Sequence, residues 1–250
     1  MTDAAFPGAS SMGRRTKARI RAVHVARLIA RLFPGSSHPT TTRGHIGHIG
    51  TPRLYDAFAN VLFFGRRRAT FQGLIAAASV RPGQRILDVG CGTGYFARLL
   101  AQAVGPEGLV VGIDPSPEMI TYASRKAGRA RNCQFRVGTA ESLDFPAEHF
   151  DVVVSSLVMH HLPKDLRVPA LREMRRVLRP GGKLLVADAQ IPRHGLGWRL
   201  LAVITGHGRM ARMVPHLELL AAQAEFAEVR TGEAPPWLRY VHAVRAASAM

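Results

Sequence analysis

The sequence predicts an α/β fold, in which a Rossmann-like, seven-stranded and mostly parallel sheet carries helices on both faces and includes an antiparallel end strand. Apolar strand-like runs alternate with helical stretches between residues 85 and 189, and this alternation is typical of parallel strands joined by right-handed crossovers. A glycine-rich loop, "DVGCGTG", follows the first run. Two strand-like stretches near the C-terminus are separated only by "EAPP", and so short a link favours antiparallel pairing.

The individual elements follow in order along the chain. Helical character spans Pro52 to Val80. The expected strands cover residues 85–90, 108–113, 133–138, 150–156 and 183–189. The expected helices cover residues 94–104, 116–127 and 165–179, and Gly181-Gly182 is expected to form a turn. The last two strands lie in "EFAEVRTG" and "WLRYVHAVRA".

The composition allows a core and indicates an anionic partner. Of the 250 residues, 47% are hydrophobic and 20% are charged, which excludes disorder throughout. The two cysteines, Cys91 and Cys133, provide no disulfide framework, so we expect a reducing intracellular setting. The net charge is +17, and residues 1–68 hold twelve Lys and Arg against only Asp3 and Asp56. An anionic membrane, a nucleic acid or an acidic small molecule fits such an excess.

The charge distribution also suggests a division of the chain. We expect residues 1–80 to form a basic helical extension and residues 81–250 to form the main domain, with a lid-like insertion over 191–216. Basic and apolar side chains separate moderately on a predicted helix within residues 13–33. This pattern fits an interfacial helix on anionic lipid, or a helix packed on its own domain. The histidines of the loop over 34–52 lack acidic or cysteine neighbours, so no metal site is predicted.

The glycine-rich loop lies where a doubly wound sheet binds its ligand, beyond the carboxyl end of the first strand. A dinucleotide-binding loop needs a third glycine where Tyr95 stands, and a P-loop needs a Gly-Lys-Ser/Thr that does not follow. The pattern is instead acid-x-Gly-x-Gly-x-Gly, beginning at Asp88. Asp114 ends the second strand, where a carboxylate can accept both hydroxyls of a ribose. With Asp88 near an ammonium group, these features indicate S-adenosylmethionine.

Four segments resemble the class I S-adenosylmethionine-dependent methyltransferases. They are "ILDVGCGTGYFARLLA", "GIDPSPEMITYA", "GTAESLDFPAEHFDVVVSSLVMHHL" and "ALREMRRVLRPGGKLLVAD", in the order and spacing of that family across residues 82–188. The group that looks most similar is the ubiquinone/menaquinone biosynthesis C-methyltransferases and their relatives. The segment "YDAFANVLFFGRRR" of this chain also resembles the N-terminal segment of that group. The resemblance implies a class I methyltransferase fold and a methyltransferase activity.

The resemblance also implies which positions bind the cofactor. They are Asp88, Gly90, Cys91, Gly92, Gly94, Asp114, Ser116, Met119, Thr139, Ala140, Glu141 and Ser155. Tyr55 is expected to contact the tail of the cofactor or to cover the site. In the family, the position of Asp114 meets the ribose, and those of Ser116 and Met119 pack the adenine. Thr139 stands where an aspartate usually meets the adenine amine, so that contact is weaker here. Ser155 is expected to border the methyl end.

Methyl transfer is an in-line displacement that depends on alignment of the acceptor. A base helps when the acceptor is a phenol or an activated ring carbon. His160 and His161 follow the fourth strand in "MHHLP", and a histidine titrates in the right range for this role. We favour His161 as the base, with a pocket-shaping role for the pair as the alternative. The quinone methyltransferases differ at this stretch.

The segments that border the acceptor in this fold are both basic and apolar here, namely residues 14–68 and 191–216. They predict a small hydrophobic or lipid-like acceptor and a cytoplasmic enzyme, peripheral at the inner membrane face. The pI of 11.4 raises an RNA methyltransferase as an alternative, although "SSLV" offers no clamp for a base and aromatic residues make up only 7%. A non-catalytic cofactor-binding scaffold is a further alternative. The acceptor atom and the oligomeric state stay open.

Overall fold

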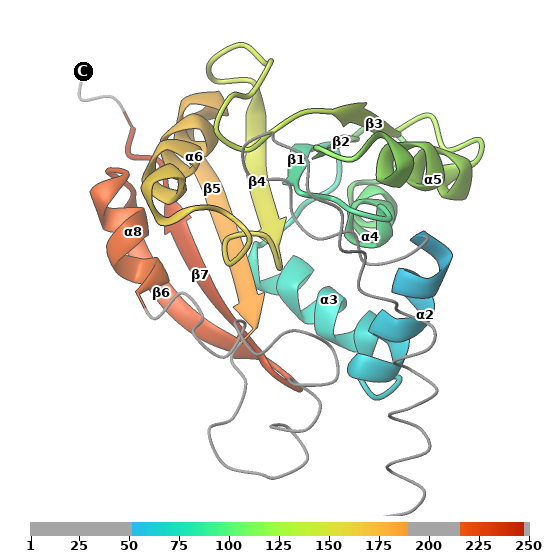
Figure 1. Ribbon diagram of the computed structural model, residues 1–250. Helices are drawn as coiled ribbons and strands as arrows, with labels where there is room; N and C mark the ends of the chain where they lie inside the picture. Colours follow the sequence, from blue (N-terminus) through green and yellow to red (C-terminus); the bar gives the residue numbers. More distant parts are fainter. Residues whose placement is uncertain (1–51, 190–215, 248–250) are drawn as a thin grey trace, which may run out of the picture.

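The computed structural model describes residues 52–189 and 216–247 (Figure 1). The interfacial helix predicted within residues 13–33, most of the loop predicted over 34–52 and nearly all of the insertion predicted over 191–216 lie outside these residues. Within the described residues, no helix is long and apolar enough to cross a membrane.

The described part of the chain forms a sheet of seven strands in the order β3-β2-β1-β4-β5-β7-β6. The strands are β1 Arg85–Val89, β2 Leu109–Asp114, β3 Cys133–Val137, β4 Phe150–Ser156, β5 Leu178–Ala189, β6 Ala227–Ala234 and β7 Leu238–Val244. β1 to β5 pair in parallel, whereas β7 is antiparallel to both of its neighbours, β5 and β6. The predicted α/β fold, mostly parallel sheet and antiparallel pair are confirmed.

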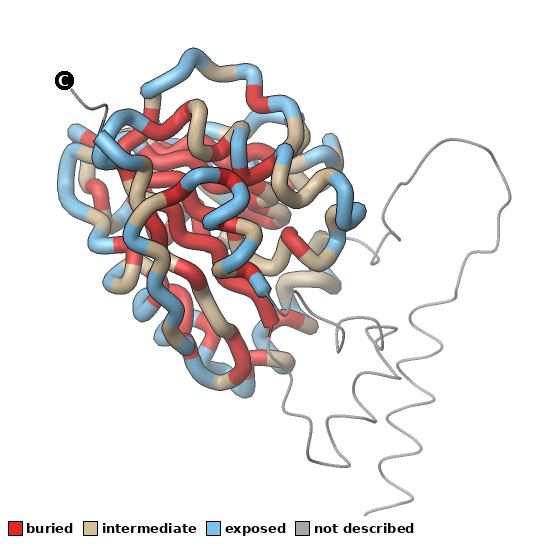
Figure 2. Tube along the Cα trace, turned by 90° about the vertical axis from the view of Figure 1, so that its left-hand side faces the viewer, coloured by how far each residue is buried: buried red, intermediate tan, exposed pale blue. Residues whose placement is uncertain are grey.

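Helices cover both faces of the sheet (Figure 1). They are α2 Pro52–Leu62, α3 Arg67–Ala77, α4 Tyr95–Val104, α5 Pro117–Ala127, α6 Lys164–Val177 and α8 Leu217–Gln223. One core packs residues of α6 and α8 against one face, and the other packs residues of α3 and α4 against the opposite face. Because side chains alternate along a strand, Leu87 and Val89 enter the first core, whereas Ile86 enters the second. Figure 2 shows these buried residues running through the centre of the molecule.

Helix α3 packs into the same core as the sheet, although it falls within the predicted N-terminal extension. Phe71 and Leu74 of α3 are buried there, and the indole of Trp237 donates a hydrogen bond to the carbonyl of Leu62 at 3.1 Å. Residues 52–77 are therefore packed against the main domain. The division at residue 80 stays a prediction, because residues 1–51 lie outside the described part.

The segment between α6 and β5 differs from its prediction. The helix ends at Val177 and the strand begins at once at Leu178, whereas the sequence predicted a helix to residue 179 and a strand from 183. The register between β4 and β5 shifts within residues 178–183, so the expected Gly181-Gly182 turn is an irregularity inside β5. Backbone hydrogen bonds join both glycines to Arg245 near the C-terminus. This distant partner extends the strand, and it cannot be read from the local sequence.

Candidate cofactor and acceptor site

The loop between β1 and α4 requires glycine for steric reasons. Gly90 and Gly94 both have positive φ angles, of 74° and 68°. A Cβ atom on Gly90 would overlap the side chain of Val158, and one on Gly94 would lie 2.6 Å from Cζ of Phe135. Gly92 also has a positive φ, but the position of its missing Cβ is open. The backbone at Gly92 can therefore lie directly against a ligand.

Asp114 ends β2 beside this loop, and the backbone orients its carboxylate. The N–H of Gly92 donates to Oδ2 at 2.9 Å, and the N–H of Ser116 donates to Oδ1 at 3.0 Å. Burial raises the pKa of Asp114, while these two hydrogen bonds act in the opposite direction. Each carboxylate oxygen can accept a second hydrogen bond. The carboxylate is thus fixed in place with capacity left for a pair of hydroxyl groups.

Asp88 is almost completely buried at the end of β1, with 1% of its surface exposed. Within residues 52–189 and 216–247, its Oδ2 atom has no hydrogen-bond partner. Burial, followed by the charge of Asp114, raises the pKa of Asp88 to about 7, although a backbone hydrogen bond from Ala97 opposes the rise. A buried acceptor without a donor is costly, so this oxygen fits a ligand that brings a donor, such as an ammonium group.

A pocket lies at the carboxyl ends of β1 and β4, which are adjacent in the sheet. The next strands in the chain, β2 after β1 and β5 after β4, lie in opposite directions along the sheet. Doubly wound folds bind their ligands at such a point. The pocket is lined by Tyr55, Ala59, Phe63, Arg67, Phe71, Asp88, Gly90, Cys91, Gly92, Thr93, Tyr95, Phe96, Ser156 and Leu157. It therefore brings together five of the positions assigned to the cofactor from the sequence, namely Tyr55, Asp88, Gly90, Cys91 and Gly92.

Asp56 ties helix α2 to the glycine-rich loop, and sequence reasoning missed it. Its Oδ1 atom accepts hydrogen bonds from Arg67 at 3.0 Å and from the Thr93 hydroxyl at 2.7 Å, while Oδ2 accepts from the Tyr122 hydroxyl at 3.3 Å. One signal was available, since Asp56 is the only acidic residue between residues 4 and 87. The neighbouring Tyr55 has a raised pKa, mainly because it is buried.

The positions assigned to the adenine lie at the carboxyl ends of β2 and β3. Ser116 caps helix α5, its hydroxyl accepting the N–H of Met119 at 3.2 Å. In the loop after β3, Thr139 pairs with Ser142 through an isolated bridge, and Ala140 is buried. Glu141 is half-buried beside Ala140. β2 and β3 are neighbours in the sheet, so the fold brings these two loops to the same edge.

At the end of β4, the structure places Ser156 in the pocket lining, while Ser155 is absent from that lining. The Ser155 hydroxyl is buried and donates to the carbonyl of Val89 at 3.0 Å. The buried hydroxyl of Ser156 has no partner. Adjacent residues of a strand face opposite sides of the sheet. The sequence analysis expected Ser155 to border the methyl end, whereas the structure places its neighbour Ser156 in the pocket lining.

The two histidines after β4 occupy different environments. His160 is largely buried, and its Nδ1 lies 2.6 Å from Oδ1 of Asp188 near the end of β5. The backbone N–H of His160 also donates to Oδ2 of Asp188, at 3.1 Å. His161 is exposed, and its ring centroid lies 3.9 Å from that of His160. If Asp188 accepts the Nδ1 proton, the neutral imidazole of His160 carries its lone pair on Nε2.

Comparison with known families agrees with this geometry. Residues 86–182 match a family model described as a methyltransferase domain. This part of the chain is similar to methyltransferase domains. It resembles the ubiquinone/menaquinone C-methyltransferases, and its cofactor is S-adenosylmethionine. The cofactor fits an open backbone at Gly92, an oriented carboxylate at Asp114 and an unpartnered buried acceptor at Asp88.

Two curated relatives act on chemically different acceptors, according to their names. The chain is 36% identical over 146 residues to a ubiquinone/menaquinone biosynthesis C-methyltransferase of Shewanella frigidimarina, a match that covers 57% of each protein. It is 40% identical over 115 residues to an arsenite methyltransferase of Halobacterium salinarum, a match that covers 45% of this chain and 29% of the relative. The matched part is thus little more than half the length of the first relative.

A solved structure supports the fold. A S-adenosylmethionine-dependent methyltransferase from Aquifex aeolicus superposes with a TM-score of 0.52 and 21% sequence identity, covering 70% of this chain and 89% of that protein. At this identity the comparison bears on the fold alone. The described part of this chain therefore has the Rossmann-like architecture of the class I methyltransferases.

Proposed function

We propose that the protein transfers a methyl group from S-adenosylmethionine to a small, hydrophobic or lipid-like acceptor. The observation that carries the proposal is a pocket lined by Asp88 and Gly92 at the point where the chain crosses the sheet, with Asp114 held beside it by the N–H of Gly92. In this proposal Asp114 accepts the ribose hydroxyls, and Asp88 accepts the ammonium group of the amino-acid tail. The loops at Ser116–Met119 and Thr139–Glu141 border the adenine.

The bound cofactor supplies a methyl group already activated on a sulfonium. The protein then needs to hold the acceptor in line with that group, and such alignment can lower a barrier by roughly 7–11 kcal/mol. We assign proton removal to Nε2 of His160 in preference to His161, because the contact with Asp188 fixes the ring of His160. Removal of a phenol or enol proton makes the acceptor more nucleophilic, an effect of about 10²–10⁴-fold in general base catalysis.

The lining of the pocket supports an organic acceptor. Phe63, Phe71 and Phe96 contribute apolar surface, and the first relative is named for methylation of quinones. An arsenic acceptor would favour thiolate ligands. The two cysteines of the chain, Cys91 and Cys133, are both buried, and burial is the main cause that raises the pKa of each thiol. Buried protonated thiols are poor ligands, so an organic acceptor is favoured over arsenite.

The test is transfer of a labelled methyl group from S-adenosylmethionine to a cell extract, followed by separation into organic and aqueous phases. We expect the label in the organic phase, together with a product that can be identified. Asp114→Ala serves as the control and should lose this label. Label in a nuclease-sensitive aqueous fraction would instead support RNA methylation. Cofactor binding without transfer to any fraction would support a non-catalytic scaffold.

A further inference from the structure

Arg67 is a buried cation in the wall of the cofactor pocket. Only 6% of its surface is exposed, and it lines the pocket together with Asp88. Its Nη1 atom donates to Asp56 at 3.0 Å, and its guanidinium carbon lies 3.8 Å from the centre of the Tyr95 ring. Its Nε atom is buried without a hydrogen-bond partner among the described residues. The guanidinium is therefore fixed in place while one of its donors is unused.

An unused, buried donor on a cation fits an anionic acceptor. Leaving such a group without a partner costs roughly 1–3 kcal/mol, and a carboxylate is the acceptor that matches guanidinium geometry. Asp56 does not fill this role for Nε, because its contact is with Nη1 and it also accepts from Thr93 and Tyr122. A ligand that enters the pocket can supply the missing acceptor.

The same pocket also holds a buried hydrogen-bond acceptor that lacks a donor. Oδ2 of Asp88 is a buried acceptor without a donor, and Nε of Arg67 is a buried donor without an acceptor. Both residues line the pocket, one from β1 and the other from α3. A zwitterion satisfies both at once, because it brings an ammonium group and a carboxylate on adjacent positions.

We propose that Arg67 binds the α-carboxylate of the methionine tail of S-adenosylmethionine, opposite the ammonium group held by Asp88. This inference rests on the proposed cofactor site and assigns a role to a residue of α3, outside the glycine-rich loop. Arg67 thereby makes the pocket selective for ligands with an intact amino-acid tail. It also joins that tail to helix α2 through Asp56.

The experiment compares two ligands that differ only in the carboxylate, S-adenosylmethionine and its decarboxylated form, by titration calorimetry. The wild type is expected to prefer S-adenosylmethionine by at least tenfold, as the loss of one charge-assisted hydrogen bond predicts. Arg67→Gln should bring the ratio of the two affinities close to one, mainly by weakening S-adenosylmethionine. Arg68→Gln is the matched control, because Arg68 is an exposed arginine next in sequence, and it should keep the wild-type ratio.

Two results would overturn the inference. One is equal binding of both ligands by the wild type. The other is a loss in Arg67→Gln that is the same for both ligands, which would mean that Arg67 only holds α2 in place through Asp56. If Arg67→Gln does not fold, Arg67→Lys is measured instead. Lysine keeps the positive charge but lacks the planar, forked donors of a guanidinium. It should therefore lower the ratio of the two affinities at least threefold. A wild type that binds neither ligand contradicts the proposed function itself.

Discussion

At the scale of a single residue, Asp88 shows that a buried group suited to binding a ligand lowers the stability of the folded protein. Its pKa is about 7 in the folded chain, against an ordinary value of 3.8. Between these values the folded state holds more protons than the unfolded state, so stability falls as the pH rises towards 7 and stays low above it. Burial of an unpartnered carboxylate is thus a cost that the folded protein bears until a cationic ligand is bound.

Asp88→Asn is expected to stabilise the cofactor-free protein at pH 8, because it removes the buried charge. The gain relative to wild type is at most about 4 kcal/mol, and it should shrink at pH 5, where the wild-type carboxyl is protonated. Thermal unfolding at both pH values measures it. Asp144→Asn, at an exposed position, is the control for the loss of one negative charge. A stabilisation by Asp88→Asn that is equal at pH 5 and pH 8 would contradict the assignment of the raised pKa.

His160 and Asp188 allow the proposed base to be separated from its neighbour. His160→Gln should lower kcat by about 10²-fold or more, with the dissociation constant of the cofactor unchanged. His161→Gln should keep most of the wild-type kcat. Asp188→Asn should lower kcat through the loss of ring orientation. Equal kcat values for His160→Gln and His161→Gln would remove His160 from the mechanism.

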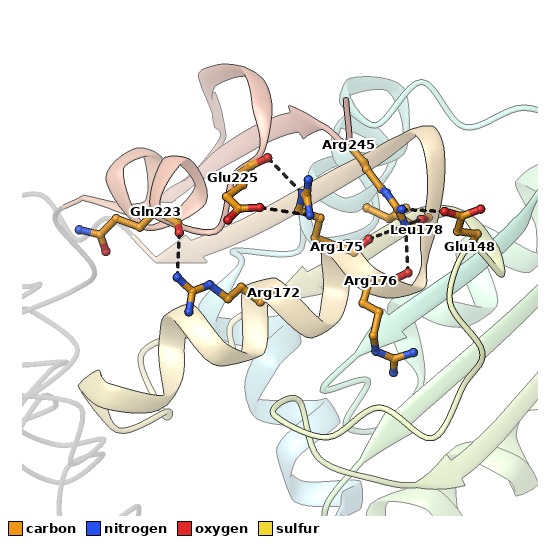
Figure 3. Close-up of polar contacts among 8 residues, drawn as sticks. All are labelled: Glu148, Arg172, Arg175, Arg176, Leu178, Gln223, Glu225 and Arg245. Carbon is orange, nitrogen blue, oxygen red and sulfur yellow. Dashed lines mark hydrogen bonds and ion pairs between the residues drawn. The ribbon is translucent and has the colours of Figure 1, made fainter. Parts of the chain in front are cut away.

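At the scale of elements, arginine side chains hold helix ends together on the face formed by α6 and α8 (Figure 3). Nη1 of Arg245, which follows β7, donates to three carbonyls at the end of α6, those of Arg175, Arg176 and Leu178. Its Nη2 atom donates to Glu148 at 2.7 Å. Cations at a helix C-terminus interact favourably with its unpaired carbonyls. This contact joins α6, β5 and the C-terminal segment.

Arg245→Ala is therefore expected to lower the free energy of unfolding by roughly 1–3 kcal/mol, because these carbonyls lose a charged hydrogen-bond donor. Arg172→Ala is the matched control on the same face. Arg172 makes a single long contact, 3.5 Å to the carbonyl of Gln223, and its loss should cost less than about 0.5 kcal/mol. Chemical denaturation measures both. Equal effects in the two variants would show that the carbonyl contacts of Arg245 contribute little.

At the scale of elements, the sequence predicts the positions of those strands and helices that a local pattern of residues marks. β1 to β4 and helices α4 and α5 lie within about two residues of their predicted positions, because alternating apolar runs and glycines mark them. The start of β5 depends on pairing with Arg245, and the contacts of Asp56 and Arg67 depend on how α2 and α3 pack. These features arise from long-range contacts, so a local pattern does not reveal which residues are the partners.

At the scale of the whole molecule, the net charge is +17, and the proposed cofactor site does not account for it. We propose that residues 1–50 hold the protein at an anionic membrane surface, where a lipid-like acceptor would be found. Removal of residues 1–50 should reduce sedimentation of the protein with vesicles that contain anionic lipid. Neutral vesicles and high salt serve as controls, since both weaken electrostatic binding. Equal sedimentation of the truncated and full-length proteins with anionic vesicles would remove the membrane from this proposal.

The position of β7 has a consequence for how the chain is made. β7 follows β5 and β6 in the chain and is therefore synthesised after them, yet it lies between them and pairs with both. Until residues 238–244 emerge, β5 has an open edge and β6 has no strand to pair with. Unpaired strand edges on a nascent chain favour aggregation. A chain cut short before residue 238 should thus be prone to self-association, although it already contains the complete glycine-rich loop and every histidine and carboxylate assigned to the site.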